Sequence, residues 1–155
     1  MDLFFILSAK YLFVIPILVL GVYFLSQPRS VQKRILVFAL PSLAFIYLLA
    51  LLGGYIYFDT RPFVVGNFTP LIPHTPDNGF PSDHALLVSA VAAIGIYLNR
   101  KLGIVLWVLA LTVAAARVYV GLHHPIDVAG SMAISILATS VIYFLIKNVW
   151  PKETI

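Results

Sequence analysis

Seven polar or charged side chains stand out in this chain because their types suit the binding and transfer of a phosphate group. Two guanidinium groups can hold one phosphate through paired N–H donors. Two imidazoles can supply a nucleophile and a proton donor near neutral pH. The set therefore predicts an anion site, provided that the fold brings its members together. The residues are Arg61, Ser82, Asp83, His84, Arg117, His123 and Asp127.

His123 and Asp127 lie four residues apart, and Pro125 between them suits the first turn of a helix. We expect Asp127 to accept a hydrogen bond from the ring N–H of His123. Such a bond fixes the tautomer and leaves the other ring nitrogen as a nucleophile. Two alternatives stay open. Asp127 can be a capping residue beside an interfacial histidine, or it can bind a metal together with His84 and His123, although neighbouring arginines disfavour a cation.

The segment Pro81-Ser82-Asp83-His84 is typical of a helix start, with Ser82 at the N-cap. The free N–H groups and the positive dipole end of such a helix start attract anions. A histidine there titrates near neutrality and can donate a proton. The plainer alternatives are a simple helix start, and arginines that anchor the chain at lipid headgroups.

The composition places these residues in a membrane protein. The chain has 155 residues, 61% hydrophobic and only 10% charged, and its mean hydropathy is +1.01. Too few polar residues remain to cover a water-facing surface, so lipid must be part of the solvent. The length allows one domain, which we place at residues 1–155. The absence of cysteine excludes disulfides and thiolate metal sites, and a net charge of +4 is too small and scattered to indicate nucleic acid.

Five apolar stretches predict an all-α, polytopic membrane helix bundle with about five transmembrane helices. The third stretch is shorter than the roughly 20 residues that cross a bilayer. We expect its helix to begin near Ser82 and to be partly shielded by protein at that end. The stretches are residues 3–25, 35–58, 85–98, 102–120 and 126–146.

The loops between these stretches separate by charge. One set is basic and holds Arg29, Lys33, Arg34, Arg100, Lys101, Lys147 and Lys152. The other set holds five of the six acidic residues, Asp2, Asp59, Asp77, Asp83 and Asp127, with all four histidines. By the positive-inside rule the basic loops are cytoplasmic. The N-terminus is then outside, the C-terminus inside, and the candidate site lies at the extracytoplasmic face.

The candidate residues resemble the three motifs of the type-2 phosphatidic acid phosphatase superfamily, the membrane lipid phosphate phosphatases. Those motifs read K-x(6)-R-P, P-S-G-H and S-R-x(5)-H-x(3)-D. Eight specified positions match in order and spacing: Arg61, Pro62, Pro81, Ser82, His84, Arg117, His123 and Asp127.

Three positions depart from the motifs. Gly54 replaces the lysine, Asp83 the glycine and Ala116 the serine. Lys10, in the first apolar stretch, is a candidate to replace the missing lysine. The alternative is that Lys10 simply snorkels to the membrane surface.

The resemblance implies a metal-independent reaction that uses no cofactor. His123 would attack phosphorus and become a phosphohistidine, while Asp127 would orient it. His84 would protonate the leaving group and then activate water. The phosphate-binding residues would be Arg61, Arg117, Ser82 and Asp83.

Within the superfamily, Phe63, Ile72-Pro73-His74, Asp77 and Phe80 resemble the bacitracin-resistance type of undecaprenyl-diphosphate phosphatase. That resemblance implies hydrolysis of a polyprenyl diphosphate in a prokaryotic cell membrane, so the partners would be the membrane and a lipid phosphate or diphosphate. Two other functions stay open: a broad phospholipid phosphatase for phosphatidic acid or phosphatidylglycerol phosphate, and a non-enzymatic lipid-phosphate binder or transporter. Charges at one face rather than along the spans disfavour transport. The sequence leaves the oligomeric state open.

Overall fold

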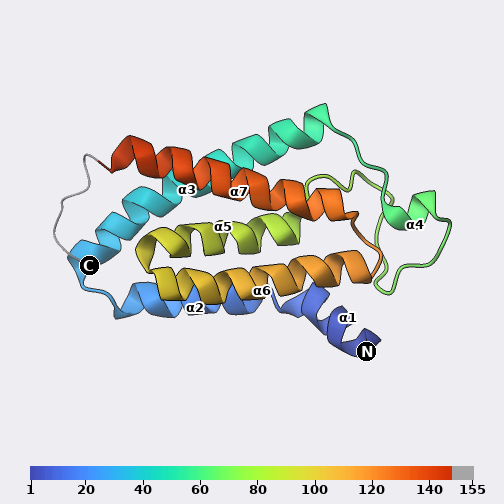
Figure 1. Ribbon diagram of the computed structural model, residues 1–155, viewed down its shortest axis with the longest axis horizontal. Coiled ribbons are helices and arrows are strands. Elements are labelled where there is room, and N and C mark those ends of the chain that lie inside the picture. Colours follow the sequence, from blue (N-terminus) through green and yellow to red (C-terminus); the bar gives the residue numbers. More distant parts are fainter. Residues whose placement is uncertain (148–155) are drawn as a thin grey trace.

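The computed structural model describes residues 1–147, and this part of the chain is helical, with no strand. One isolated antiparallel bridge joins Thr60 to Asn78. Apart from the short α4, the helices lie side by side in one bundle (Figure 1). Residues 148–155, with the predicted cytoplasmic Lys152 and the end of the predicted domain, lie outside the described residues. The helices are α1 (Asp2–Tyr11), α2 (Val14–Ser26), α3 (Arg29–Ile56), α4 (Pro62–Val65), α5 (Asp83–Leu98), α6 (Arg100–Tyr119) and α7 (Pro125–Ile146).

The helices α1 and α2 form a bent pair within the first predicted apolar stretch. The bend between them is 47°. Pro16, in the first turn of α2, accounts for the break. Its nitrogen cannot donate a helix hydrogen bond, and in a continuous helix its ring would clash with the carbonyl group of Leu12. Together the two helices are long and apolar enough for one broken span or a re-entrant loop.

The helix α5 is the centre of the bundle. It packs most extensively against α6 and α7 and also contacts α2 and α3. It begins at Asp83 with Ser82 in the N-cap position, as predicted. Most of its residues are buried, so protein shields it along its whole length and not at one end alone. Close contact with α6 depends on Gly103, where a Cβ atom would lie 2.5 Å from the backbone of Ile96.

Three helices, α3, α6 and α7, are each long and apolar enough to cross a membrane, and the bent pair α1–α2 makes a fourth candidate. α5 is apolar but has only 16 residues. Large apolar side chains are exposed on the long helices, among them Leu48 and Leu52 on α3, Leu111 on α6 and Leu137 on α7. Such an extensive outward apolar surface fits lipid and not water. The structure thus confirms an all-helical described chain with membrane-capable helices.

The two ends of the bundle carry different loops (Figure 1). The start of α1, α4 with its flanking loops, and the turn between α6 and α7 lie together at one end, which we call the site end. The α2–α3 and α5–α6 junctions and the end of α7 lie at the opposite end. The basic residues Arg29, Arg100, Lys101 and Lys147 begin or follow these helices, so they lie away from the site end.

Candidate active site

The turn between α6 and α7 carries His123 into the interior of the site end. Gly121 turns the chain there with a φ of +82°, a conformation that favours glycine. The His123 side chain is 3% exposed, and its Nδ1 lies 3.0 Å from the carbonyl oxygen of Gly79. Because a carbonyl oxygen only accepts, Nδ1 carries the proton and donates this bond. The lone pair of the neutral ring is therefore on Nε2.

Two guanidinium groups face the Nε2 atom of His123. Arg61 Nη1 lies 3.4 Å from that nitrogen and Arg117 Nη2 lies 3.3 Å from it. Guanidinium N–H groups only donate, which agrees with a lone pair on Nε2. Both arginine side chains are buried, and they come from separate elements, the loop after α3 and the last turn of α6. An anion that approaches Nε2 thus meets donors from two sides.

The loop after α3 and the turn before α7 hold Arg61 in place. Its Nη1 donates to the carbonyl oxygen of Leu122 at 3.0 Å, and its Nε donates to Asp77 Oδ1 at 2.5 Å. Asn78 ties the loop together, since its Oδ1 accepts from the backbone N–H of Asp59 at 2.9 Å. The orientation of Arg61 is therefore fixed by Asp77, which precedes α5 in the sequence, and by Leu122, which follows it.

Two buried donors at the site have no hydrogen-bond partner among the described residues. They are Arg117 Nε and Ser82 Oγ. Ser82 occupies the N-cap position of α5, but its hydroxyl does not cap the helix. Arg117 is anchored elsewhere, because its Nη1 donates to the carbonyl oxygen of Ala9 in α1 at 3.5 Å. An unpaired buried polar group costs about 1–3 kcal/mol, so both donors fit a site that receives an anion.

His84 lies in the first turn of α5 at the same end. Phe13, at the start of α2, meets its ring edge-on with the ring centroids 5.0 Å apart. The charges of Arg117 and His123 also act on this imidazole, which places His84 in their neighbourhood. The Asp83 side chain is exposed, and its backbone N–H is one of the helix-start N–H groups that have no partner within a helix.

Asp127 is fully buried in the first turn of α7. Its Oδ2 accepts a hydrogen bond from the backbone N–H of His124 at 2.9 Å and lies 3.4 Å from His123 Nδ1. The same carboxylate thus caps the helix, in a capping box with His124, and contacts the neighbouring histidine. The shorter partner of His123 Nδ1 is the Gly79 carbonyl group, which the sequence did not predict.

Comparison with known proteins places this arrangement in a family. A model described as the PAP2 superfamily matches residues 34–151. The chain belongs to the PAP2 superfamily. Undecaprenyl-diphosphatase BcrC of Bacillus subtilis (strain 168) is 33% identical to it over 124 residues, which are 78% of this chain and 62% of that protein. The bacitracin transport permease protein BcrC of Bacillus licheniformis is 30% identical over 138 residues, 88% of this chain and 67% of that protein. The chain therefore spans slightly less than two thirds of the B. subtilis relative.

Two solved structures share the fold of this superfamily member. The first transmembrane PAP2 type phosphatidylglycerolphosphate phosphatase from Bacillus subtilis has a TM-score of 0.67 and 22% identity, and the match covers 97% of this chain and 76% of that one. LpxE of Aquifex aeolicus has a TM-score of 0.68 and 19% identity, with 91% and 81% covered. At these identities the likeness concerns the fold.

The structure places two positions that bear on the missing superfamily lysine. Gly54 packs directly against the loop, since a Cβ atom there would lie 3.1 Å from the carbonyl oxygen of Phe80. The candidate substitute Lys10 has an exposed side chain, and its Nζ lies 5.4 Å from the ring centroid of Tyr11. Among residues 1–147, the cations that contact His123 are Arg61 and Arg117.

The electrostatic environment favours a neutral His123. Burial lowers the pKa of the His123 ring below its usual 6.5; the hydrogen bond to Asp127 partly offsets this, and the charges of Arg117 and Arg61 lower the pKa further. At Asp77, burial raises the pKa of the carboxyl group, but hydrogen bonds from Arg61 and Thr75 lower it, and the net shift is downward. His123 is therefore a neutral imidazole near neutral pH, and Asp77 is an ionised partner of Arg61.

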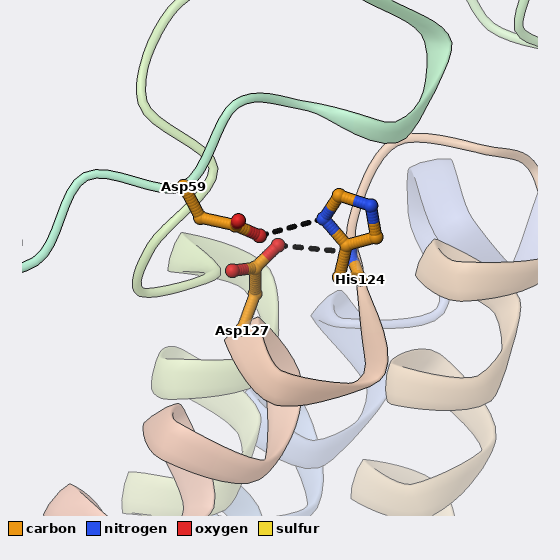
Figure 2. Close-up of side chains that lie close together, drawn as sticks. All are labelled: Asp59, His124 and Asp127. Carbon is orange, nitrogen blue, oxygen red and sulfur yellow. Dashed lines mark hydrogen bonds and ion pairs between the residues drawn. The ribbon is translucent and has the colours of Figure 1, made fainter. Parts of the chain in front are cut away.

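The sequence placed His124 among the polar residues at this end but gave no role to it or to Asp59. The two side chains contact each other beside Asp127 (Figure 2). Asp59 Oδ2 lies 2.6 Å from His124 Nδ1. These three residues form the described group whose ligand atoms are near enough, within 4.8 Å of one another, to bind a metal ion. The alternative set of His84, His123 and Asp127 is not the group that the structure gathers. The available signal was position alone, since Asp59 and His124 stand next to motif residues.

Proposed function

We propose that this chain is an integral membrane lipid phosphatase that converts a polyprenyl diphosphate to the monophosphate and inorganic phosphate through a phosphohistidine at His123. One observation carries the proposal: the unprotonated Nε2 of His123 faces guanidinium groups 3.3 and 3.4 Å away. Paired cations beside a nucleophile neutralise the negative charge that otherwise repels attack on a phosphate. Membership of the PAP2 superfamily supports the same chemistry.

In the first step, His123 Nε2 attacks the terminal phosphorus in line with the bridging oxygen. A P–N bond forms, the P–O bond to the bridging oxygen breaks, and His84 gives a proton to the departing lipid monophosphate. Arg61 and Arg117 turn their N–H donors toward the equatorial oxygens. Asp127 stabilises the positive charge that the phosphorylated imidazole acquires, because its carboxylate lies 3.4 Å from Nδ1.

In the second step, water attacks the phosphohistidine. His84 takes a proton from this water, the P–N bond breaks, and His123 Nε2 regains its lone pair as phosphate leaves. The unpartnered donors Ser82 Oγ and Arg117 Nε suit the oxygens of both the substrate and the intermediate. Two arginines and the start of α5 supply the positive charge for this reaction, so we propose that it needs neither a metal nor a cofactor.

A groove between α3 and α5 suits the apolar part of such a substrate. Its volume is about 270 Å³, and its lining includes Leu43 and Tyr47 from α3 and Leu87 and Ala90 from α5. Asp83, in the first turn of α5, also lines the groove. An isoprenoid chain in this groove would bring its phosphate groups to the start of α5, where the candidate catalytic residues lie.

The proposed topology has five crossings, with α1–α2 as one bent span and α5 as a short span inside the bundle. The N-terminus and the site end would then be extracytoplasmic. The basic residues at the opposite end of the bundle support this orientation by the positive-inside rule.

The choice of a diphosphate rests on the relatives. The B. subtilis relative carries the name undecaprenyl-diphosphatase, and a putative undecaprenyl-diphosphatase YbjG of Escherichia coli (strain K12) is 31% identical over 122 residues, 77% of this chain and 60% of that protein. We propose that the same class of lipid, a long isoprenoid chain with two phosphates, is the substrate here.

The test uses the full chain purified in detergent with EDTA. Phosphate release is measured from a polyprenyl diphosphate, phosphatidic acid and phosphatidylglycerol phosphate, with wild type, His123→Ala and His74→Ala in parallel. We expect release to be fastest from the diphosphate and abolished in His123→Ala. A radiolabelled terminal phosphate should give an acid-labile, base-stable phosphoprotein in wild type and in His74→Ala, which keeps the nucleophile.

Four results would overturn parts of the proposal. Phosphate release that survives His123→Ala removes the covalent mechanism. Release that requires a divalent ion removes the metal-independent mechanism. Binding of the diphosphate without any release favours the non-enzymatic lipid-phosphate binder, and faster release from phosphatidic acid or phosphatidylglycerol phosphate favours the broad phospholipid phosphatase.

A further inference from the structure

We propose that Asp59 is a positioning residue that fixes the tautomer and orientation of His123 through two separate paths. This inference rests on the proposed function, in which His123 Nε2 is the nucleophile. The Asp59 side chain is 17% exposed, and its hydrogen bonds join it to Asn78, Gly79 and His124. None of these partners is the reacting nitrogen or a guanidinium group, so the effect of Asp59 on catalysis must pass through other residues.

The first path runs through the backbone of Gly79. The N–H group of Gly79 donates to the carbonyl oxygen of Asp59 at 2.8 Å. The carbonyl oxygen of Gly79 accepts from His123 Nδ1 at 3.0 Å. The N–H group of Gly79 is therefore fixed by Asp59, and its carbonyl oxygen fixes the imidazole of His123. The position of Gly79 thus sets the direction in which Nδ1 donates its proton.

The second path runs through the side chain of Asp59 (Figure 2). Asp59 Oδ2 lies 2.6 Å from His124 Nδ1, and a carboxylate accepts, so the proton of His124 is on Nδ1. The backbone N–H of His124 donates to Asp127 Oδ2 at 2.9 Å. That same oxygen lies 3.4 Å from His123 Nδ1. Through His124, Asp59 thus helps to fix the position of Asp127 Oδ2, the second acceptor near His123 Nδ1.

Both paths end at an acceptor for the same proton, the one on His123 Nδ1. The groups that form the two paths are closely packed around Gly79. A Cβ atom on Gly79 would lie 3.0 Å from Asp127 Oδ2 and 3.2 Å from the Asp59 carbonyl oxygen. If the second path is removed, the Asp127 carboxylate is less firmly positioned. The imidazole of His123 can then rotate or change tautomer. Nε2 then faces the arginines for less of the time, and a misplacement of about 1 Å costs roughly a hundredfold in rate.

A metal ion held by Asp59, His124 and Asp127 is the competing interpretation of this cluster, since their ligand atoms lie within 4.8 Å of one another. Two of those atoms already have partners, because His124 Nδ1 donates to Asp59 and Asp127 Oδ2 accepts from a backbone N–H. In Figure 2 the other oxygen of Asp127 points away from the cluster. These contacts favour a positioning role, and the experiment below distinguishes the two.

The kinetic arm compares Asp59→Ala, Asp59→Asn and Asp2→Ala on the polyprenyl diphosphate. Asp59→Ala cuts the second path, so kcat should fall at least tenfold while KM stays within about twofold. Asp59→Asn keeps an oxygen that can accept from His124 and should recover most of that loss. Asp2→Ala is the matched control, because Asp2 accepts a hydrogen bond from the Tyr119 hydroxyl at 2.9 Å on the exposed surface. Should Asp59→Ala fail to fold, His124→Ala cuts the same path from its other side.

The spectroscopic arm reports on His123 itself and needs no turnover. In detergent micelles with ¹⁵N-labelled histidine, His123→Gln assigns the signals. Wild type should show a protonated Nδ1 and an unprotonated Nε2 as two widely separated resonances, and Asp59→Ala should draw them together through tautomer exchange. Unchanged resonances and kcat in Asp59→Ala would overturn the proposal, as would a wild-type pattern that EDTA abolishes and Zn²⁺ restores. A wild type that hydrolyses no lipid phosphate refutes the proposed function alone, since the resonances still test the positioning.

Discussion

His123 donates from Nδ1 to the carbonyl oxygen of Gly79, a residue 44 positions earlier in the chain. The orientation of the proposed nucleophile therefore depends on the backbone of the loop before α5 and not only on the carboxylate four residues after it. A backbone acceptor cannot be deleted by mutation, but the loop that carries it can be displaced.

Gly79→Ala should displace that loop. The new Cβ atom would lie 3.0 Å from Asp127 Oδ2 and 3.2 Å from the Asp59 carbonyl oxygen, so one of these groups must move. We expect kcat to fall about tenfold or more and the free energy of unfolding to fall by about 1–3 kcal/mol, measured by phosphate release and thermal unfolding in detergent. Gly21→Ala is the control, because its Cβ atom meets nothing within 4 Å. Equal effects at both glycines would contradict this account.

The pH dependence should follow the neutral form of His123. Burial and the two arginine charges lower the pKa of this ring below 6.5, and activity is lost as the pH falls through that pKa, so the acidic limb of kcat/KM should lie below pH 6.5. Asp127→Asn removes an interaction that raises the pKa and should move the limb to lower pH. The ratio of mutant to wild-type profiles cancels the ionisation of the substrate. An acidic limb that moves to higher pH in Asp127→Asn would show that Asp127 lowers the pKa of His123 and does not raise it.

His84→Gln should harm hydrolysis of a monophosphate more than hydrolysis of a diphosphate. A diphosphate releases a phosphate monoester, which is a good leaving group, whereas a phosphatidic acid releases an alkoxide that needs a proton more. The measurement is kcat for polyprenyl diphosphate and phosphatidic acid, each relative to wild type. Equal losses on the two substrates would refute the role of His84 as proton donor.

Asp77→Asn should strengthen substrate binding. Asp77 holds Arg61 Nε at 2.5 Å, and its side chain is 56% exposed, so its negative charge competes with a phosphate for the same guanidinium group. Removing the charge should lower KM for the diphosphate about two- to fivefold, because such charge pairs near the surface are worth about 0–1 kcal/mol. Thermal stability should change little for the same reason. An increase in KM would instead mean that Asp77 chiefly orients Arg61.

Gly54→Lys should not raise activity, although it restores the superfamily lysine. A Cβ atom at position 54 would lie 3.1 Å from the carbonyl oxygen of Phe80, so the loop that carries Asn78 and Phe80 must shift to admit any side chain. We expect kcat/KM to fall. Gly54→Ala separates the effect of the Cβ atom from that of the ammonium group, and higher activity in the lysine variant than in wild type would contradict the argument.

The sequence was sufficient to predict features that depend on local chemistry. Ser82 marked the start of α5 one residue before its first helical position. The motif spacing also placed Arg61 and Arg117 with His123, because each lies at an end of an apolar stretch and those ends meet in the bundle.

The remainder of the site depends on contacts that leave no mark in the sequence. The acceptor of His123 Nδ1 is a peptide carbonyl group, which every residue carries, so no residue type identifies Gly79. The pair of Asp59 and His124 joins residues 65 positions apart and becomes visible only when the loop is folded. The predicted orienting residue Asp127 lies within reach of His123, at 3.4 Å from Nδ1, but shares this task with the loop.

Two like charges converge on one imidazole nitrogen, and among the described residues a single carboxylate, Asp77, contacts either guanidinium group. Repulsion between the two buried guanidinium groups lowers the stability of the protein without a bound anion. A small oxyanion that binds between them offsets this repulsion. Orthophosphate, the product, meets that description as well as the lipid does. Under the proposed function, we therefore expect orthophosphate to be a competitive inhibitor that also stabilises the fold, so that its release limits the rate of the cycle.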